Sequence, residues 1–349
     1  MRSVVHLSIP EGTHVYNRLR SQVLAAGILD RSYSYYLPLI AVVFAAYIAS
    51  IWAIYAFDSF PLVLLGCLGV TFLTAQVAGI NHDCGHRAAF KSTRMNDVVG
   101  LMASALIGLV FDNWRTRHNI HHAAPNEAGR DPDLEIPMIA TSARLMEAKS
   151  SFQRYFARYQ AWYYYPLGGI VSFSNRLGSI TYFRQRRPSW AYFGRLLLYL
   201  PSIAVLFVLP IVLFSPEKAL FVLVFTHIAT GIYLMNCFAP NHKGMAVVYE
   251  EDRLSFFEQQ VSTSRNVTGG WLTDVLLVGL NHQVEHHLFP TCPRNKLHLI
   301  RPFLVEACAE TGVEFVETGI IQTNRDILRH LACASRGIEP EPRYAEALS

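Results

Sequence analysis

Histidines gather in three short clusters of this chain, at residues 82–86, 118–122 and 282–287. The first cluster places two histidines four residues apart, and the second places three at spacings of three and four residues. On an α-helix such side chains lie on one face, one turn apart, so the imidazole nitrogens of a cluster converge. This is enough imidazole to hold more than one metal ion. The eight histidines are His82, His86, His118, His121, His122, His282, His286 and His287.

The ligand type narrows the choice of metal without fixing it. Imidazole suits zinc, copper, iron and nickel. A structural zinc site normally includes cysteines, and no cysteine pair accompanies these histidines. Soluble di-iron bundles use mainly carboxylate ligands, which are sparse inside the clusters. The residue types in the three clusters therefore favour a pair of iron ions that is bound mainly by histidine and carries out oxidation with O2.

The elements that position the clusters are predicted to be membrane-spanning helices. The chain is 52% hydrophobic and 16% charged, and its apolar residues are bunched. A stretch of about 20 residues without charge is long enough to cross a hydrocarbon core of roughly 30 Å. Four such stretches occur, at 37–57, 61–80, 196–214 and 219–240. A fifth apolar segment, 98–111, is too short to span and is expected to lie in the interface or to re-enter it.

The spans are predicted to pair as two hairpins. Only three residues separate the first two spans and only four separate the last two, so each pair returns to its starting side. Of the 30 Lys and Arg residues, 15 lie in 81–195, ten follow residue 240 and four precede residue 37. Lys218 alone lies at a hairpin tip. By the positive-inside rule, the large polar parts, the histidine clusters and both termini are cytoplasmic.

These observations predict an all-α integral membrane protein that forms a single domain over residues 1–349. Two transmembrane helical hairpins, with four spans, lie under a cytosolic helical cap that holds a histidine-rich di-metal site. The cap is expected to comprise 81–195 and 241–349, and to be closed by amphipathic helices at 302–310 and 325–334. The basic cluster 184–187 and the aromatic run 155–165 are typical of a surface that faces anionic lipid headgroups, not nucleic acid.

One further ligand candidate follows the fourth span. His242 comes directly after Pro240 and Asn241, on the same side of the membrane as His82. The helices that carry both residues must then extend past the membrane surface. His227, within the fourth span, is about 22 Å from His242 along a continuous helix and is expected to have a packing role.

The boxes themselves resemble those of a known family. They read HDCGH, HNIHH and QVEHH, in the order HxxxH, HxxHH and [H/Q]xxHH, and are flanked by NEAGRDPD at 126–133 and HHLFPTCPR at 286–294. Over roughly residues 35–300 the chain resembles the integral-membrane fatty acid desaturases, in particular their acyl-lipid and front-end branch. The resemblance implies a mushroom-shaped helical protein with a di-iron centre in its cytosolic cap. It also implies O2-dependent removal of two hydrogens from an acyl chain.

The expected ligands and their supporting groups combine the spacing with this resemblance. Nine metal ligands are expected: His82, His86, His118, His121, His122, His242, Gln283, His286 and His287. Gln283 is preferred to His282 because it repeats the spacing of His118 to its partners, and His282 is expected to be a neighbouring support. Asp131 and Asp133 are expected to accept hydrogen bonds from ligating imidazoles, although a solvated Asp-Pro-Asp turn is the alternative. The resemblance also favours an asparagine near a metal-bound water, for which Asn236 and Asn241 are candidates.

Several alternatives for the reaction stay open. The substrate is expected to be a fatty acyl chain carried by a lipid, an acyl-CoA or an acyl-carrier protein. No HPGG haem motif, GxGxxG or cysteine cluster is present, so electrons are expected from an external ferredoxin or free cytochrome with its reductase. The same boxes would suit a hydroxylase, ketolase or acetylenase. A zinc-dependent membrane hydrolase or a metal-binding receptor is a more distant alternative.

Overall fold

The computed structural model describes residues 6–339, which fold into two compact units. The first, called here the membrane unit, consists of Arg31–Thr116 and Tyr165–Asn236. The second, called the polar unit, consists of 6–30, Arg117–Tyr164 and 237–339.

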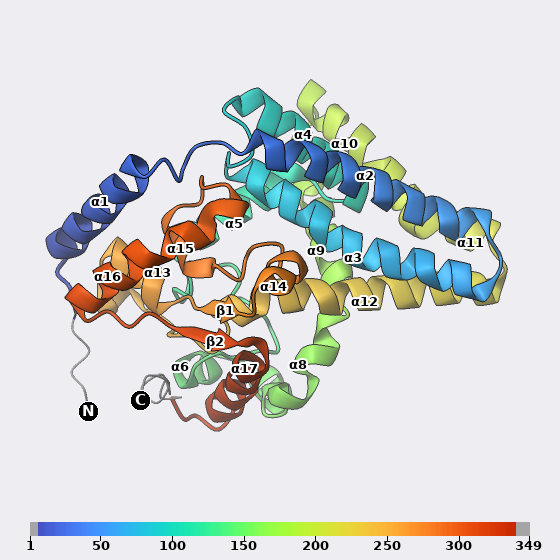
Figure 1. The fold of residues 1–349 in the computed structure, drawn as a ribbon. Coiled ribbons are helices and arrows are strands. Elements are labelled where there is room, and N and C mark those ends of the chain that lie inside the picture. The colour runs from blue at the N-terminus through green and yellow to red at the C-terminus, as the bar shows by residue number, and fades with distance from the viewer. Residues whose placement is uncertain (1–5, 340–349) are drawn as a thin grey trace. The chain divides into compact units, whose positions relative to one another are not determined.

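Within residues 6–339, four helices are long and apolar enough to cross a membrane, as the sequence predicts. They are α2 (Tyr33–Ala56), α3 (Phe60–Gly85), the run Trp190–Leu213 and α12 (Pro216–His242). Figure 1 shows α2 and α3 side by side, and their buried side chains form one apolar core. Side chains such as Leu65 and Leu197 stay exposed on these helices, as expected of surfaces that face lipid. As expected, α3 and α12 continue beyond their apolar runs and carry His82 and His242 in their last turns.

The third span is interrupted by a π-helical turn. It consists of α10 (Trp190–Ile203), the π turn η1 (Ala204–Val208) and α11 (Leu209–Leu213). Within η1 the carbonyl oxygens of Val205 and Leu206 accept hydrogen bonds from the Tyr55 hydroxyl, at 2.5 Å, and from His227 Nε2, at 3.2 Å. The His227 ring also stacks on Phe207, with 4.1 Å between ring centroids. These contacts give His227 the packing role expected of it.

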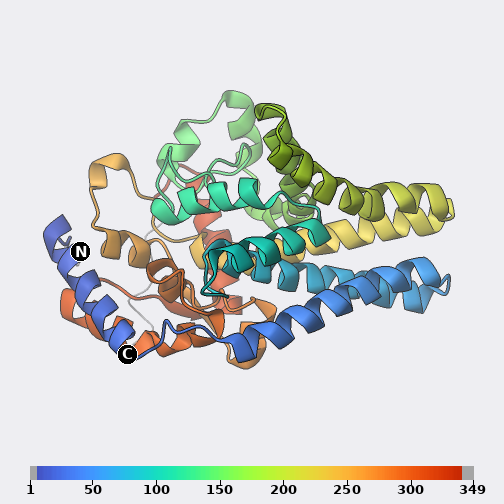
Figure 2. The same cartoon turned by 90° about the horizontal axis from the view of Figure 1, so that it is seen from above.

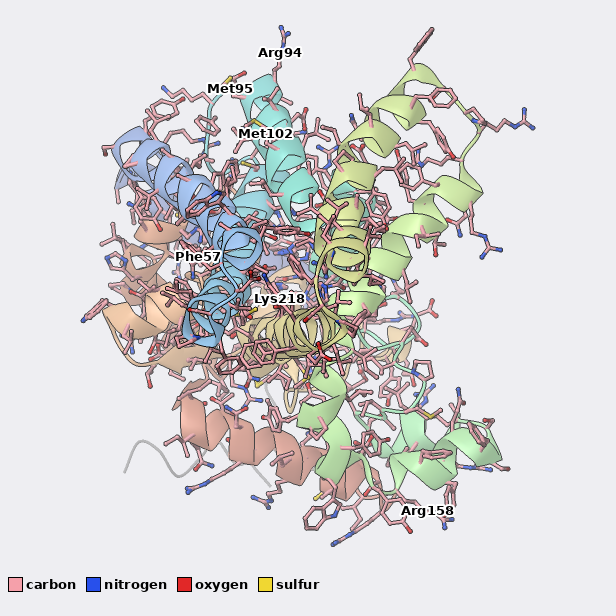
Figure 3. All side chains as sticks on the ribbon, turned by 90° about the vertical axis from the view of Figure 1, so that its right-hand side faces the viewer. Phe57, Arg94, Met95, Met102, Arg158 and Lys218 are labelled. Carbon is pink, nitrogen blue, oxygen red and sulfur yellow. The ribbon has the colours of Figure 1, made fainter. Side chains whose placement is uncertain are left out.

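The two hairpins are joined at their tips. Figure 2 shows both hairpins ending together, and Figure 3 labels Phe57 and Lys218 at this end. Lys218 Nζ donates to the Phe57 carbonyl oxygen at 2.8 Å and lies 2.9 Å from Asp58 Oδ1. The single basic residue of the tips therefore ties one hairpin to the other.

The short apolar segment predicted at 98–111 lies in a pair of helices that meet at a bend. Helix α4 (Thr93–Ile107) begins after the cap residue Ser92 and ends at Gly108, whose φ of 70° is in the left-handed region. Helix α5 (Phe111–Ala123) follows at an angle of 105°. With 15 residues, α4 alone is shorter than the roughly 20 that a span requires.

The polar unit is built from short helices around an apolar core. Helix α1 (Ile9–Ala25) buries Val15, Leu19 and Val23 against α13 (Phe256–Ser262) and α16 (Arg301–Thr311). The helices predicted at 302–310 and 325–334 are confirmed as α16 and α17 (Ile320–Ala334). The other helices that lie wholly within this unit are α6 (Ala143–Glu147), α7 (Ser151–Ala157), η2 (Glu250–Asp252), α14 (Trp271–Leu276), α15 (Gln283–Leu288) and η3 (Arg294–Leu299).

A small two-stranded sheet departs from the all-helical fold. Strands β1 (Asn266–Thr268) and β2 (Glu317–Gly319) pair in parallel, with Asn266 opposite Glu317. Three-residue strands are too short for an alternating pattern, so the sequence carries no signal for them.

Glycines allow one close approach inside the membrane unit. Helix α8 (Gln160–Gly168) ends at a turn that leads into α9 (Val171–Gln185), and this turn packs on α12. A Cβ at Gly231 would lie 2.4 Å from the Gly168 carbonyl oxygen and 2.9 Å from that of Gly169. Such distances require the backbone segments to separate, so the packing depends on the missing side chain.

Replacing this glycine is therefore expected to destabilise the fold. Gly231→Ala should lower stability by about 1–3 kcal/mol, because overpacking moves backbone and not a flexible side chain. The midpoint of thermal unfolding in detergent measures the effect. Gly194→Ala is the matched control, since nothing lies within 4 Å of its Cβ position. If the two variants unfold at the same temperature, the close approach does not limit stability.

Candidate metal centre

Two of the histidine clusters converge within the polar unit. Helix α5 carries His118 and His122 one turn apart, with 3.1 Å between their Nε2 atoms. Helix α15 brings His286 Nε2 to 3.1 Å from His122 Nε2. The i, i+4 spacing on α5 and the position of α15 thus bring three imidazoles together.

A second group lies beside the first. His121, His242 and His287 are all buried, and each offers a ring nitrogen within 4.8 Å of those of the other two. His121 Nε2 and His242 Nε2 are 3.3 Å apart. His242, from the end of α12, therefore joins the residues of the second and third clusters, as the sequence predicts.

Outward hydrogen bonds define the tautomers of this second group. His242 Nδ1 donates to the Thr263 carbonyl oxygen at 3.0 Å, and His121 Nδ1 donates to Asp131 Oδ2 at 2.9 Å. His287 Nδ1 donates to Gln260 Oε1 at 2.8 Å. Because these oxygens only accept, each Nδ1 carries a hydrogen, so the neutral form of each ring has its lone pair on Nε2, the nitrogen opposite that hydrogen bond.

This arrangement fits a bound cation. Metal–nitrogen bonds of about 2.0–2.1 Å place neighbouring ligands of one ion roughly 2.9–3.4 Å apart. Three pairs of Nε2 atoms, those of His118 with His122, His122 with His286 and His121 with His242, are 3.1–3.3 Å apart. Two nitrogen lone pairs this close repel one another unless a proton or a metal ion lies between them. The histidines therefore match the donor set of transition-metal ions such as iron, zinc or copper.

Asp131 is the better placed of the two predicted aspartates. It is fully buried and accepts hydrogen bonds from His121 Nδ1, from the Asn126 backbone N–H at 2.8 Å and from the Asp133 N–H at 2.8 Å. Burial alone would raise the pKa of Asp131. The hydrogen bond and charge of His121, with smaller contributions from the Asp133 N–H and Lys243, instead lower it to about 2. The carboxylate is thus ionised at neutral pH and orients His121.

Asp133 lies further from the imidazoles. Its Oδ2 is 3.9 Å from His121 Nδ1, and its Oδ1 accepts from Arg117 at 3.0 Å. The Asp133 side chain is half exposed. The solvated-turn alternative therefore describes Asp133 better than it describes Asp131.

Gln283 faces the second histidine group, and His282 does not. Gln283 Nε2 lies 2.9 Å from His242 Nε2, and Gln283 Oε1 accepts from Asn241 Nδ2 at 3.1 Å. His282 precedes α15, and its Nε2 is 3.3 Å from Asp274 Oδ1. His282 joins neither histidine group found among the described residues. Coordination by Gln283 would require its amide to present Oε1 inward, because the amide nitrogen has no lone pair to give.

Asn241 adds a polar atom beside this glutamine. Its Nδ2 donates to Gln283 and, at 3.2 Å, to the Cys237 carbonyl oxygen. Its Oδ1 is buried and has no hydrogen-bond partner within the part of the chain that the structure describes. A water molecule or a cation near Gln283 would satisfy this oxygen.

The first cluster lies at the end of α3 in the membrane unit. His82 and His86 have ring nitrogens within 4.8 Å of each other, and both side chains are buried. Asp83 is buried too, and its Oδ2 accepts from the Tyr36 hydroxyl at 2.8 Å. A Cβ at Gly85 would lie 2.7 Å from the Trp114 ring, so this position in HDCGH needs glycine.

Some supporting groups were not predicted from the sequence. Gln260 and the Thr263 carbonyl hold His287 and His242, yet both lie in a segment without a recognisable motif. Gln260 Nε2 also donates to the His122 carbonyl oxygen at 3.2 Å, which fixes its amide orientation. Asn126, inside the quoted string 126–133, donates to the carbonyl oxygens of His242 and Ala246, each at 3.1 Å.

Known proteins share this sequence pattern. A protein-family model described as fatty acid desaturase matches residues 58–319. An acyl-lipid 8-desaturase of Rebecca salina is 30% identical over 77% of this chain. An acyl-lipid (9-3)-desaturase of Physcomitrium patens is 28% identical over 92% of it. The matches span 63% of the length of each of these two relatives.

A third relative, a Delta(5) fatty acid desaturase of Caenorhabditis elegans, is 28% identical over 86% of this chain and 69% of its own length. The family match takes in all three histidine clusters and His242. The chain is a membrane protein that belongs to the fatty acid desaturase family.

Proposed function

We propose that this chain is an O2-dependent di-iron desaturase that introduces a double bond into a fatty acyl chain of a lipid or thioester. In this reaction –CH2–CH2– becomes –CH=CH–, and the two hydrogens removed, together with two electrons and two protons from the donor system, reduce O2 to two water molecules. When bound, the iron ions supply the oxidising power. The inward-facing Nε2 atoms of His121, His242 and His287 are the observation that carries the proposal.

The ligands are assigned by group. We propose that His118, His122 and His286 hold one iron, and that His121, His242, His287 and Gln283 hold the other. We propose that His82 and His86 complete the di-iron centre, because they have the HxxxH spacing and lie within the family match. Asp131 orients His121, and Asn241 is proposed to hold a water molecule next to Gln283. His282 and Asp133 are proposed as outer supports.

The protein's own contribution is to keep these ligands oriented and dry. Each outward Nδ1 hydrogen bond prevents its imidazole from turning its lone pair away from the centre. Burial of His121, His242 and His287 excludes bulk water, which limits loss of oxidant to side reactions. The buried Asn126 holds the backbone after His242 in place, so the ligand on α12 keeps its position.

The substrate, donor and orientation are proposed from the family and the charge distribution. The two relatives first named are acyl-lipid desaturases, which favours a lipid-bound acyl chain, with an acyl-CoA or acyl-carrier protein as alternatives. Electrons are proposed to come from a ferredoxin or a free cytochrome. The bias of Lys and Arg away from the hairpin tips supports a cytoplasmic active site and termini.

The proposal is tested by expressing the chain in a host and analysing its fatty acids by gas chromatography and mass spectrometry. A new double bond supports it and reports the position of the reaction. A hydroxylated or oxo acid would instead show that the centre inserts oxygen. Purified protein that holds zinc alone after growth with ample iron would contradict a di-iron enzyme.

Removal of a single imidazole should abolish the product. We expect His122→Ala and His287→Ala to lose bound iron and all desaturation, while membrane insertion continues, because neither residue lies in a span. Iron content and fatty acid analysis of membranes measure the effect. His298→Ala, at an exposed position, is the control and should keep activity. Full product in both ligand variants would refute the centre.

The two aspartates should differ in importance. Asp131→Asn is expected to lower iron occupancy or turnover by about 10–100-fold, because the buried carboxylate that orients His121 loses its charge. Asp133→Asn should change either quantity far less. The two variants are compared by the iron content and the turnover of purified protein that is supplied with a redox donor. Equal effects of both substitutions would return Asp131 to the role of an ordinary turn residue.

The third box allows the glutamine to be compared with its neighbour. Gln283→His should keep activity, because imidazole can fill the same coordination position, whereas Gln283→Ala should lose most of it. His282→Ala should lose less than Gln283→Ala. Product yield in the expressing host ranks the three variants. An inactive, iron-free His282→Ala beside a normal Gln283→Ala would reverse the assignment.

A further inference from the structure

A long basic segment of the chain has no role in the proposed centre. Between Glu147 and Glu217 the sequence contains eight Lys and Arg residues and no Asp or Glu. Positive charge there is not neutralised by neighbouring carboxylates along the chain. Three of the eight, Arg184, Arg186 and Arg187, follow one another closely at the junction between α9 and α10.

The junction forms a pocket in the membrane unit. Its volume is about 510 Å³, within the range of sites that take small ligands. The end of α9 provides Tyr182 and Gln185, the connection provides Arg186 and Arg187, and the first turn of α10 provides Tyr192. Ser189 and Ala191 complete the lining.

One guanidinium is held at the pocket by an aromatic ring. Arg186 Cζ lies 4.6 Å from the centroid of the Tyr182 ring, and Tyr182 is itself buried. The ring thus anchors an otherwise exposed side chain by a cation–π interaction. Arg186 and Arg187 both line the pocket, and the planar set of N–H donors of each guanidinium suits phosphate, which arginine binds with paired hydrogen bonds.

The surroundings of the pocket favour a lipid as the source of that phosphate. Helix α10 begins a membrane span directly after the pocket. Trp190 is 94% exposed and Leu197 is 75% exposed on this helix. Tryptophan at the start of a span is typical of the headgroup layer of a bilayer. A ligand in this pocket would therefore have its phosphate at headgroup depth and its tails along α10.

We propose that the pocket at the α9–α10 junction binds the phosphate of a phospholipid headgroup through Arg186 and Arg187. The site would recruit or retain an anionic phospholipid beside the third span. This role does not depend on the proposed oxidation chemistry, because it requires only the pocket and its charges.

The test is lipid binding by the full-length protein in detergent, followed by native mass spectrometry. Phosphatidylglycerol is titrated into wild type, the double variant R186Q/R187Q and the control R325Q/R329Q. The control removes two exposed charges from α17, outside the pocket. We expect affinity to fall by about 10–30-fold in R186Q/R187Q, from roughly 1 kcal/mol per basic residue, and to be unchanged in the control. Diacylglycerol, which has the tails without phosphate, should bind weakly to all three.

Two results would overturn the proposal. The first is equal phosphatidylglycerol affinity in wild type and R186Q/R187Q, or an equal loss in both double variants. The second is displacement of the lipid from wild type by millimolar inorganic phosphate or coenzyme A, which would assign the pocket to a soluble phosphate compound. Unchanged thermal unfolding of R186Q/R187Q verifies that loss of lipid is not loss of fold.

Discussion

The proposed metal centre depends on hydrogen bonds that its histidines make on the side facing away from the metal. An imidazole can present a lone pair to a metal only if its other nitrogen keeps the hydrogen, and a buried N–H needs an acceptor. Asp131, the Thr263 carbonyl and Gln260 provide acceptors for His121, His242 and His287. Without them the rings could rotate or change tautomer, and the inward nitrogens would no longer face one another.

The fold of the polar unit supplies those acceptors from separate parts of the chain. Asp131 follows α5 in a turn that Asn126 starts with a φ of 52°, and Gln260 lies in α13. Asn126 connects this turn to α12 through the His242 carbonyl oxygen. The histidines on α5, α12 and α15 are thus held by a buried polar network as well as by apolar packing. Such a network is stabilising only when its members are satisfied, which explains why so many of its donors are paired.

The sequence predicts those features that depend on local patterns. The four spans follow from charge-free runs of about 20 residues, and the convergence of His118 with His122 follows from helical spacing. Gln283 and Asp131 could be proposed because each lies at a definite distance from a histidine box. In each case the feature is determined by residues that lie close together in the sequence.

Other features depend on contacts between distant segments, and the sequence does not predict them. A backbone carbonyl such as that of Thr263 has no residue-specific signal, and Gln260 resembles any polar helix residue. Between the end of β1 and the start of β2 lie 48 residues, and both strands are too short to show an alternation of apolar and polar residues. The need for glycine at Gly231 becomes evident only when the Gly168 carbonyl lies against it.

X-ray absorption at the iron edge, on purified iron-loaded protein, tests the central claim most directly. Eight histidines shared between two irons correspond to about four imidazoles per iron, and imidazole rings give a characteristic outer-shell scattering pattern. The account predicts two irons per chain with scattering dominated by imidazole and without sulfur ligands. A single iron per chain, or ligation dominated by oxygen with no more than one imidazole per iron, would contradict it.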